Sequence, residues 1–172
     1  MQRLIAGLSL LLLAGCGSLP AGMAPVERFD LERYSGTWYE VIRLENRFER
    51  GLSRVTAQYT VQSDGSVRVL NRGYADADSV WKEASGKAKF AGASTEGRLK
   101  VSFFGPFYAP YIVFDLDAVD YQYAFVSGGE RTLWLLARTP TVDDALIERF
   151  LAAAARFGYA LDELVYVEHG PL

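Results

Sequence analysis

The amino-acid sequence predicts an all-β domain: an eight-stranded antiparallel up-and-down barrel with a C-terminal α-helix packed outside it. Three observations support this fold class. Short strand-like segments follow one another along most of the chain, turn-forming residues separate them at regular intervals, and apolar residues take a helical period only near the C-terminus. The regular spacing fits a meander of hairpins in a barrel or in a sandwich. Eight strands are enough to close a small barrel with an interior of ligand size.

Alternation and turn chemistry mark the predicted strands. Residues 55–62 alternate strictly between apolar and polar side chains, which is the period of a half-buried strand. Asp64-Gly65 follows as a hairpin turn, because an Asp-Gly pair readily adopts the positive φ angles of tight turns. The eight predicted strands cover residues 38–44, 55–62, 66–74, 81–90, 99–103, 111–116, 123–127 and 132–138.

The pattern changes period after the eighth predicted strand. Thr141 is placed to cap a helix, and Asp143 and Asp144 suit the positive end of the helix dipole. Gly158 is placed to end the helix, since glycine accepts the left-handed conformation found at helix C-termini. A last short strand is predicted over residues 164–168. The apolar stripe of the helix consists of Leu146, Ile147, Phe150, Leu151, Ala154 and Phe157.

The N-terminal residues carry the pattern of an export signal. Arg3 precedes an apolar run, residues 4–13, that is too short to span a bilayer comfortably. The run ends in Leu13-Ala14-Gly15-Cys16, which resembles the lipobox of bacterial lipoproteins, where the cysteine thiol is acylated and the chain is cut before it. Cys16 is the only cysteine, so it has no disulfide partner. The alternative is an ordinary signal peptide, or a buried first helix, with an incidental cysteine.

The chain is therefore predicted to have three parts. Residues 1–15 form the lipoprotein signal peptide, residues 16–27 an acylated tether, and residues 28–172 a single folded domain. The segment Gly17-Ser18-Leu19-Pro20 is typical of a flexible tether. Because the anchor would use Cys16, the domain has no internal disulfide, and its stability depends on its core.

Composition and missing motifs exclude several classes of function. The formal net charge is −3 and there is no basic run, so nucleic acid is a poor candidate partner. His169 is the sole histidine, and we expect it to be an exposed residue of the C-terminal tail rather than a metal or haem ligand. The sequence has no Cys/His metal cluster, no Gly-x-Ser-x-Gly elbow and no glycine-rich phosphate loop. We therefore predict no enzymatic activity and no cofactor.

Three ordered motifs carry a resemblance to a known family. Gly36-Thr37-Trp38-Tyr39-Glu40 matches a Gly-x-Trp opening. Val119-Asp120-Tyr121 matches a second motif, and Arg138 after Leu133-Trp134-Leu135-Leu136 matches a third. From about residue 29 to residue 169 the chain thus resembles the lipocalin family, and within it the bacterial lipoprotein lipocalins. That branch is further marked by residues 47–52, 71–74, 103–108 and 138–141. The resemblance implies lipid transport or storage and a role in maintaining the cell envelope.

Alternating strand directions place the three motifs at one end of the barrel. If the first strand rises from Gly36, then Trp38 starts it, Asp120-Tyr121 lies between strands six and seven, and Arg138 ends strand eight. A guanidinium over an indole ring is a favourable cation–π contact, worth about 0.5–2 kcal/mol. We therefore expect Trp38, Asp120, Tyr121 and Arg138 to form the structural floor of the barrel rather than a catalytic site.

Strand alternation also predicts which side chains face the lumen. With Trp38 facing inward, the interior is mostly apolar, and the small residues Ala84, Gly86 and Ala88 leave space in it. A register slip of one residue would reverse the faces of any strand. The predicted ligand-binding residues of the lumen are Glu40, Ile42, Ala57, Tyr59, Val69, Asn71, Phe90, Val101 and Phe103.

The mouth of the barrel is predicted to carry two further ligand-binding residues. Phe107 and Tyr108 belong to the connection 104–110, which lies at the end opposite the floor. With Phe104 they would form an apolar rim at the site where barrels take up their ligands. The alternative is that these aromatic side chains pack beneath their own loop.

The leading hypothesis is a lipid-binding protein that carries or stores a fatty acid or lysophospholipid in the barrel. In bacterial lipoproteins, an aspartate directly after the acylated cysteine is associated with retention in the inner membrane. Gly17 occupies that position here, so we expect a lipid anchor in the outer membrane, facing the periplasm. One alternative is a structural or assembly lipoprotein whose barrel is filled by its own side chains. The third hypothesis, an isomerase or lipid-modifying enzyme, is the least favoured of the three, because the sequence lacks a recognisable set of catalytic groups. The expected partners are a lipid and the membrane, and a homodimer is left open.

Overall fold

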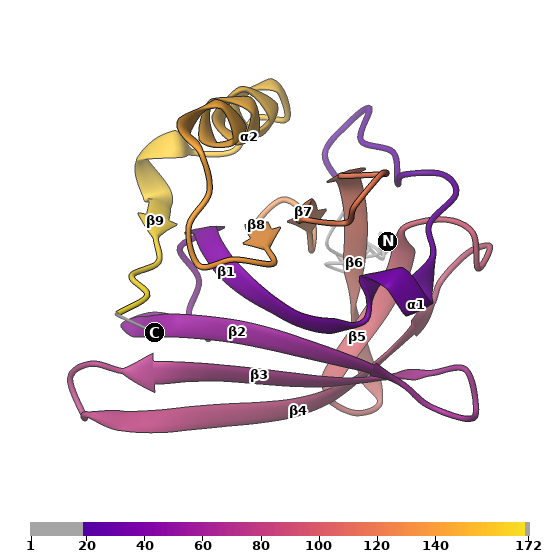
Figure 1. Cartoon of the computed structure of the whole chain (residues 1–172), viewed down its shortest axis with the longest axis horizontal. Coiled ribbons are helices and arrows are strands. Elements are labelled where there is room, and N and C mark those ends of the chain that lie inside the picture. Colours follow the sequence, from indigo (N-terminus) through magenta and orange to yellow (C-terminus); the bar gives the residue numbers. More distant parts are fainter. Residues whose placement is uncertain (1–18, 171–172) are drawn as a thin grey trace, which may run out of the picture.

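The computed structural model of the chain describes residues 19–170, and the predicted signal peptide and Cys16 lie outside them. Strands β1 to β8 form an antiparallel meander, and β1 pairs with both β2 and β8, so the sheet closes into a barrel (Figure 1). The strands are β1 (Gly36–Leu44), β2 (Leu52–Val61), β3 (Val67–Ala75), β4 (Val80–Phe90), β5 (Arg98–Phe104), β6 (Phe107–Leu116), β7 (Tyr123–Ser127), β8 (Leu133–Ala137) and β9 (Leu164–Tyr166).

The predicted strands are confirmed to within a few residues at each end. The turn between β2 and β3 contains Asp64-Gly65 as expected, with Gly65 at a φ of 75°. The largest difference is β6, which begins at Phe107 rather than at residue 111. Phe104 and Phe107 face each other across the turn, so the β5–β6 hairpin extends almost to its tip.

The predicted C-terminal helix is α2 (Asp144–Arg156), and Gly158 follows its end with a φ of 79°. The N-cap is Asp143, not Thr141, because the helical backbone begins only at Asp144. A carboxylate oxygen of Asp143 accepts a hydrogen bond from the backbone N–H of Leu146 at 2.8 Å. This bond satisfies one of the free donors of the first turn.

Two short helices were not predicted, because they are too short to show a period in the sequence. Helix α1 (Leu31–Tyr34) precedes β1, and its N-cap Asp30 accepts hydrogen bonds from the N–H groups of the first turn. The 3-10 helix η1 (Leu161–Glu163) leads into β9, which pairs with the end of β1 and not with another barrel strand. Within residues 19–170, no helix is long and apolar enough to cross a membrane.

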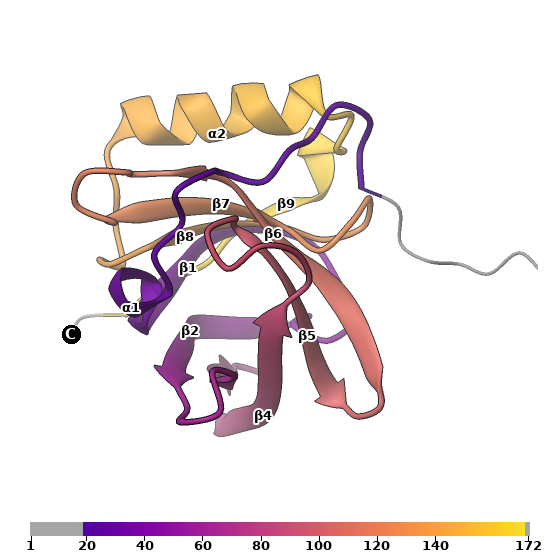
Figure 2. The same ribbon diagram turned by 90° about the vertical axis from the view of Figure 1, so that its right-hand side faces the viewer.

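Apolar side chains form two clusters, one on each side of the barrel wall. The inner cluster fills the lower lumen and includes Trp38, Tyr59 and Val69. The outer cluster lies between the wall and α2, which crosses the outside of the barrel above β7 and β8 (Figure 2). Phe150 of α2 is fully buried against Phe125 of β7, with ring centroids 5.1 Å apart. Removal of this apolar surface from water stabilises the position of the helix.

The segment that was predicted as a flexible tether is packed on the barrel from Leu19 onward. Leu19 and Met23 contact the outer cluster. The N–H of Val26 donates to the carbonyl oxygen of Val113 at 2.9 Å, and the N–H of Gly97 donates to the carbonyl oxygen of Val26 at 2.9 Å. The expectation of flexibility was made for residues 17–20, and it does not hold at Leu19, which packs on the outer cluster. Apolar side chains and backbone hydrogen bonds hold the following residues, up to Val26, to β6 and its neighbours.

Candidate functional site

Trp38 lies at the closed end of the barrel and is completely buried. Its indole Nε1 donates a hydrogen bond to the carbonyl oxygen of Tyr34 at 2.7 Å, and the Tyr34 ring lies 4.8 Å from it. The guanidinium carbon of Arg138 lies 3.9 Å from the centre of the Trp38 ring. The cation–π contact expected from the strand directions is therefore present.

The Arg138 guanidinium also binds the backbone around the floor. It donates hydrogen bonds of 2.8–3.3 Å to five carbonyl oxygens. These carbonyl groups belong to Arg33, Tyr34, Ser35, Thr37 and Tyr121. Arg138 thus joins α1, the start of β1 and the β6–β7 connection, and its contacts are those of a structural residue.

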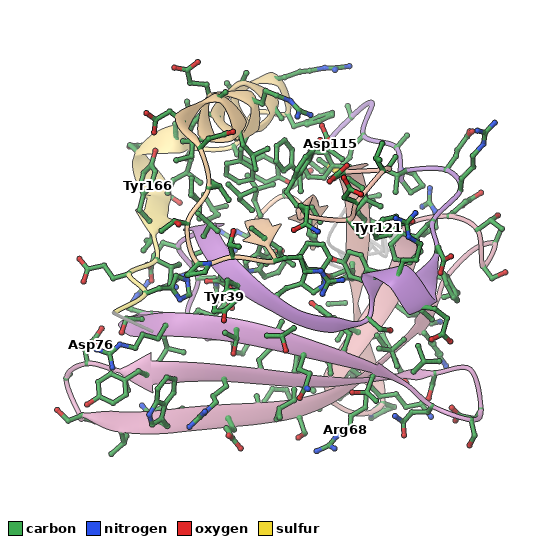
Figure 3. All side chains as sticks on the ribbon, in the orientation of Figure 1. Tyr39, Arg68, Asp76, Asp115, Tyr121 and Tyr166 are labelled. Atoms are coloured by element: carbon green, nitrogen blue, oxygen red, sulfur yellow. The ribbon has the colours of Figure 1, made fainter. Side chains whose placement is uncertain are left out.

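Tyr121 is part of the floor, whereas Asp120 is exposed. The buried Tyr121 lies beside α1 (Figure 3), and its hydroxyl oxygen accepts a hydrogen bond from the N–H of Asp30 at 3.0 Å. The carboxylate that orders this connection belongs to Asp117, which accepts bonds from three backbone N–H groups, including that of Asp120. The expectation that Asp120 packs in the floor is therefore wrong. Its backbone is fixed, but its side chain faces solvent.

Above the floor the barrel encloses a cavity of about 80 Å³, within a hollow of about 690 Å³ that includes the solvent at its opening. Sequence reasoning missed six side chains of its wall, namely Leu31, Tyr34, Glu49, Tyr111, Trp134 and Leu136. The predicted ligand-binding residues that line the cavity are Glu40, Ala57, Tyr59, Val69, Asn71, Val101 and Phe103.

Ile42 does not face the lumen, contrary to the expectation from alternation. A register shift between Glu40 and Ile42 in the β1–β8 pairing turns Ile42 outward, where it joins the cluster beneath α2. The same shift allows Arg43 to reach Glu40. Phe90 also does not line the cavity, because it packs at the closed end beside Phe29, with ring centroids 6.3 Å apart.

Phe107 and Tyr108 lie at the open end but do not line the cavity. Phe107 is 79% exposed, so the alternative that it packs beneath its loop is wrong. Tyr108 lies on the outer face of the sheet, where the ammonium groups of Lys89 and Lys100 lie 4.7 and 5.5 Å from its ring centre. The two neighbours have opposite orientations because successive residues of a strand point to opposite faces.

A buried polar cluster lies beneath the β1–β2 connection at the mouth. Arg43 is 1% exposed and donates to a Glu40 carboxyl oxygen at 3.0 Å, and also to the carbonyl oxygens of Glu49 and Leu52. The indole Nε1 of Trp134 donates to a Glu49 carboxylate oxygen at 3.1 Å. Arg43 thus ties the connection down over the lumen, and its charge is paired with Glu40 of the cavity wall, although Arg43 itself does not line the cavity.

The polar groups of the cavity wall include two carboxyl groups, those of Glu40 and Glu49, and the side-chain amide of Asn71. Burial and the neighbouring Glu49 carboxylate raise the pKa of Glu40 well above its usual range, although Arg43 opposes this shift. The Oδ1 atom of Asn71 is buried and has no hydrogen-bond partner among the described residues. No lysine, arginine or histidine side chain of the described residues lines the cavity.

Deeper in the lumen, three tyrosine hydroxyls form a chain. The Tyr111 hydroxyl lies 2.7 Å from that of Tyr34 and 2.8 Å from that of Tyr59. Burial is the main cause that raises the pKa of all three, so their neutral forms persist. Two hydrogen bonds use two of the three hydroxyl protons, so one hydroxyl proton of the chain stays available as a donor.

His169 is not an exposed tail residue as predicted. Its Nε2 donates to the carbonyl oxygen of Glu40 at 2.8 Å, and its ring lies 5.4 Å from that of Tyr39. This histidine therefore fastens the C-terminal segment to β1. The part of the chain that the structure describes contains no group of three or more histidine, cysteine, aspartate or glutamate residues arranged to hold a metal ion.

Comparisons with known proteins agree with this geometry. The family model of the lipocalin-like domain matches residues 29–169. The chain is a lipocalin. It is 50% identical to the outer membrane lipoprotein Blc of Vibrio cholerae serotype O1 over 169 residues, and this matched region covers 98% of this chain and 99% of that protein. It is 47% identical over 150 residues to the outer membrane lipoprotein Blc of Escherichia coli K12, covering 87% and 84% of the two chains.

The solved structures extend the likeness of the fold. The cockroach allergen Per a 4 superposes with a TM-score of 0.67 at 22% identity, over 88% of this lipocalin and 95% of the allergen. The two Blc relatives are outer membrane lipoproteins by name. Membership of the lipocalin family confirms the prediction that the chain is not an enzyme, since lipocalins are binding proteins. It also implies binding of a small hydrophobic ligand.

Proposed function

We propose that this lipocalin holds a single-chain lipid, a fatty acid or a lysophospholipid, and transports or stores it for maintenance of the envelope. The observation that carries the proposal is the cavity above the Trp38 floor, whose wall is mostly apolar, with a few polar groups near the mouth and three tyrosine hydroxyls deeper in the lumen. A lipid needs this combination, because its chain is buried in an apolar wall while polar groups orient its other end.

The polar groups of the wall favour the lysophospholipid over the fatty acid. A fatty-acid carboxylate at the depth of Glu40 would find no unpaired cation in the wall, because the nearby Arg43 already donates to Glu40, and it would lie near the Glu49 carboxylate. A lysophospholipid carries a glycerol hydroxyl, which can donate to Glu49 or to the unpartnered Oδ1 of Asn71. The free tyrosine proton deeper in the lumen can donate to its ester carbonyl.

The alternative function, a structural lipoprotein with a filled barrel, is favoured by the small volume of the cavity. About 80 Å³ is less than the roughly 300–1,000 Å³ of a usual ligand pocket. A lipid chain would therefore have to displace side chains at the mouth, and Phe103 and Trp134 are the large apolar residues of the wall there.

A matched pair of variants separates the two functions. Val69→Phe fills the cavity, whereas Leu70→Phe adds the same side chain to the next residue of β3, which does not line the cavity. For a carrier, Val69→Phe lowers affinity for lysophosphatidylethanolamine at least tenfold, and Leu70→Phe leaves it unchanged. Native mass spectrometry of the purified protein, followed by lipid extraction, identifies the bound molecule. If the wild type binds neither lysophospholipid nor fatty acid, the carrier function is wrong.

The anchor is proposed to be an acyl group on Cys16. The lipobox Leu13-Ala14-Gly15-Cys16 and the likeness to outer membrane lipoproteins support it. Acylation of Cys16 would hold the barrel at the membrane that supplies its ligand, with the periplasm as the expected side.

A further inference from the structure

The most exposed aromatic side chains of the described chain lie at one tip of the barrel. Phe104 and Phe107 are 72% and 79% exposed, and they oppose each other across the β5–β6 turn. Single exposed apolar residues are ordinary on protein surfaces. Two aromatic rings at the same hairpin tip, neither of which lines the cavity, are a surface feature that lipid binding inside the barrel does not explain.

The flank of the same hairpin carries positive charge without a carboxylate partner. The chain has four lysines, of which Lys82 and Lys87 form ion pairs with aspartates. Lys89 and Lys100 form no ion pair among the described residues, and both lie over the ring of Tyr108. We refer to Lys89, Lys100, Phe104, Phe107 and Tyr108 as the hairpin patch.

The start of the described chain points toward the same side of the molecule as this hairpin. In Figure 2 the first described residues, in indigo, and the β5–β6 hairpin both lie at the right-hand margin. Leu19 is held against the outer cluster, and three residue steps separate it from Cys16. Three extended residues span at most about 10 Å, so an acyl group on Cys16 would keep the bilayer close to this side of the barrel.

From these observations we infer that the hairpin patch docks on a bilayer surface that contains anionic phospholipids, as a second contact beside the acyl anchor. The Phe104 and Phe107 rings would enter the interface between headgroups and acyl chains. The ammonium groups of Lys89 and Lys100, which lie over the Tyr108 ring, would face lipid phosphates. Docking would bring the open end of the barrel next to the membrane, whichever lipid the cavity holds.

A second copy of this chain fits the patch less well than a membrane does. A two-fold interface brings the same surface of both subunits together. Four ammonium groups from Lys89 and Lys100 would then meet without a facing carboxylate from the patch itself. An anionic bilayer supplies both the missing negative charge and an apolar layer for the rings.

The test uses the full-length acylated protein reconstituted into vesicles. Phe107→Cys supplies a thiol for an environment-sensitive fluorophore, since Cys16 would be blocked by acylation. Val119→Cys is the matched control, because Val119 is 75% exposed but lies in the β6–β7 connection at the closed end. Vesicles contain phosphatidylethanolamine with phosphatidylglycerol, or phosphatidylcholine alone. Hydrogen exchange of the unlabelled wild type across residues 103–108 provides a second readout that leaves Phe107 in place.

With anionic vesicles, the emission of the fluorophore at position 107 should shift to shorter wavelength, and brominated lipids should quench it. The emission of the fluorophore at position 119 should show neither change. Lys89→Gln with Lys100→Gln should weaken the quenching at least threefold, and so should high salt. Equal signals at both positions, or no slowing of hydrogen exchange on anionic vesicles, would overturn the inference. A blue shift that depends on protein concentration without vesicles would assign the patch to a second copy instead. Lipid binding in the cavity is measured separately, so failure of either proposal is recognised on its own.

Discussion

Trp38→Ala tests whether the closed end of the barrel is structural. The side chain is fully buried, packs on Tyr34 at 4.8 Å, lies beneath Arg138 at 3.9 Å and donates a 2.7 Å hydrogen bond. Burial of about 150–250 Å² at about 25 cal/mol per Å² corresponds to roughly 4–6 kcal/mol. Alanine keeps a small part of this, while the lost hydrogen bond and cation–π contact add about 1 kcal/mol each.

These terms sum to about 5–7 kcal/mol, which is an upper bound because the unfolded chain already buries part of its apolar surface. We therefore expect a loss of unfolding free energy of about 4 kcal/mol, within the range of about 3–5 kcal/mol measured for large buried aromatic residues. For a domain of this size, about 2–4 °C per kcal/mol predicts a fall in Tm of about 8–16 °C. Trp38 does not line the cavity, so affinity for a fluorescent lipid should change less than threefold.

The assay combines thermal unfolding followed by circular dichroism with lipid titration at a temperature where both proteins are folded. Arg138→Met, alone and with Trp38→Ala, completes a double-mutant cycle for the cation–π pair, with an expected coupling of about 0.5–2 kcal/mol. A Trp38→Ala protein that melts within 2 °C of the wild type, by the same scale of a few degrees per kcal/mol, yet loses lipid affinity tenfold would refute the floor assignment.

Three further predictions follow from single side chains. Cys16→Ser should abolish palmitate labelling and membrane fractionation without changing Tm, and unchanged labelling would contradict the anchor. Burial raises the pKa of Glu40 in the folded protein, so protonation of Glu40 contributes to the free energy of unfolding. This contribution is fully present below the ordinary pKa of 4.5 and is lost as the pH rises to the folded-state pKa. Glu40→Gln should remove this decline in stability, measured by denaturant unfolding across the pH range, and an identical decline would assign it to another group. Phe107→Ser should change stability by less than about 0.5 kcal/mol, because the ring is 79% exposed, and should leave affinity for a soluble fluorescent fatty acid unchanged. A Tm lower by several degrees would show that the ring packs in the fold.

The local pattern of apolar, polar and turn residues was sufficient to predict most strands of the barrel and the residues of its floor. Strict alternation over 55–62 and the Asp64-Gly65 turn located β2, its hairpin and β3. Strand order then brought Trp38 and Arg138 together, because consecutive antiparallel strands return to the same end at every second turn. The wall residues of β2, β3 and β5 followed from the same period of two.

Local pattern failed where the backbone departs from that period or where distant segments meet. The register shift after Glu40 turned Ile42 outward and brought Arg43 to the polar cluster. Nothing in the local sequence distinguishes this bulge from a regular strand. Likewise, His169 is fixed by a carbonyl group of β1, a contact that exists only once the chain ends have come together.

The sequence by itself determined the order of the strands, the apolar lumen and the Trp38–Arg138 floor, because these depend on side-chain period and on residue type. It also predicts the export signal. Only the tertiary structure decided which polar groups face the cavity, how much space it encloses and which aromatic residues stay in solvent. These properties depend on how the sheet closes and on where bulges and hairpin tips fall. Closure of the sheet is a non-local event, since residues far apart along the chain must pair before the lumen has a shape.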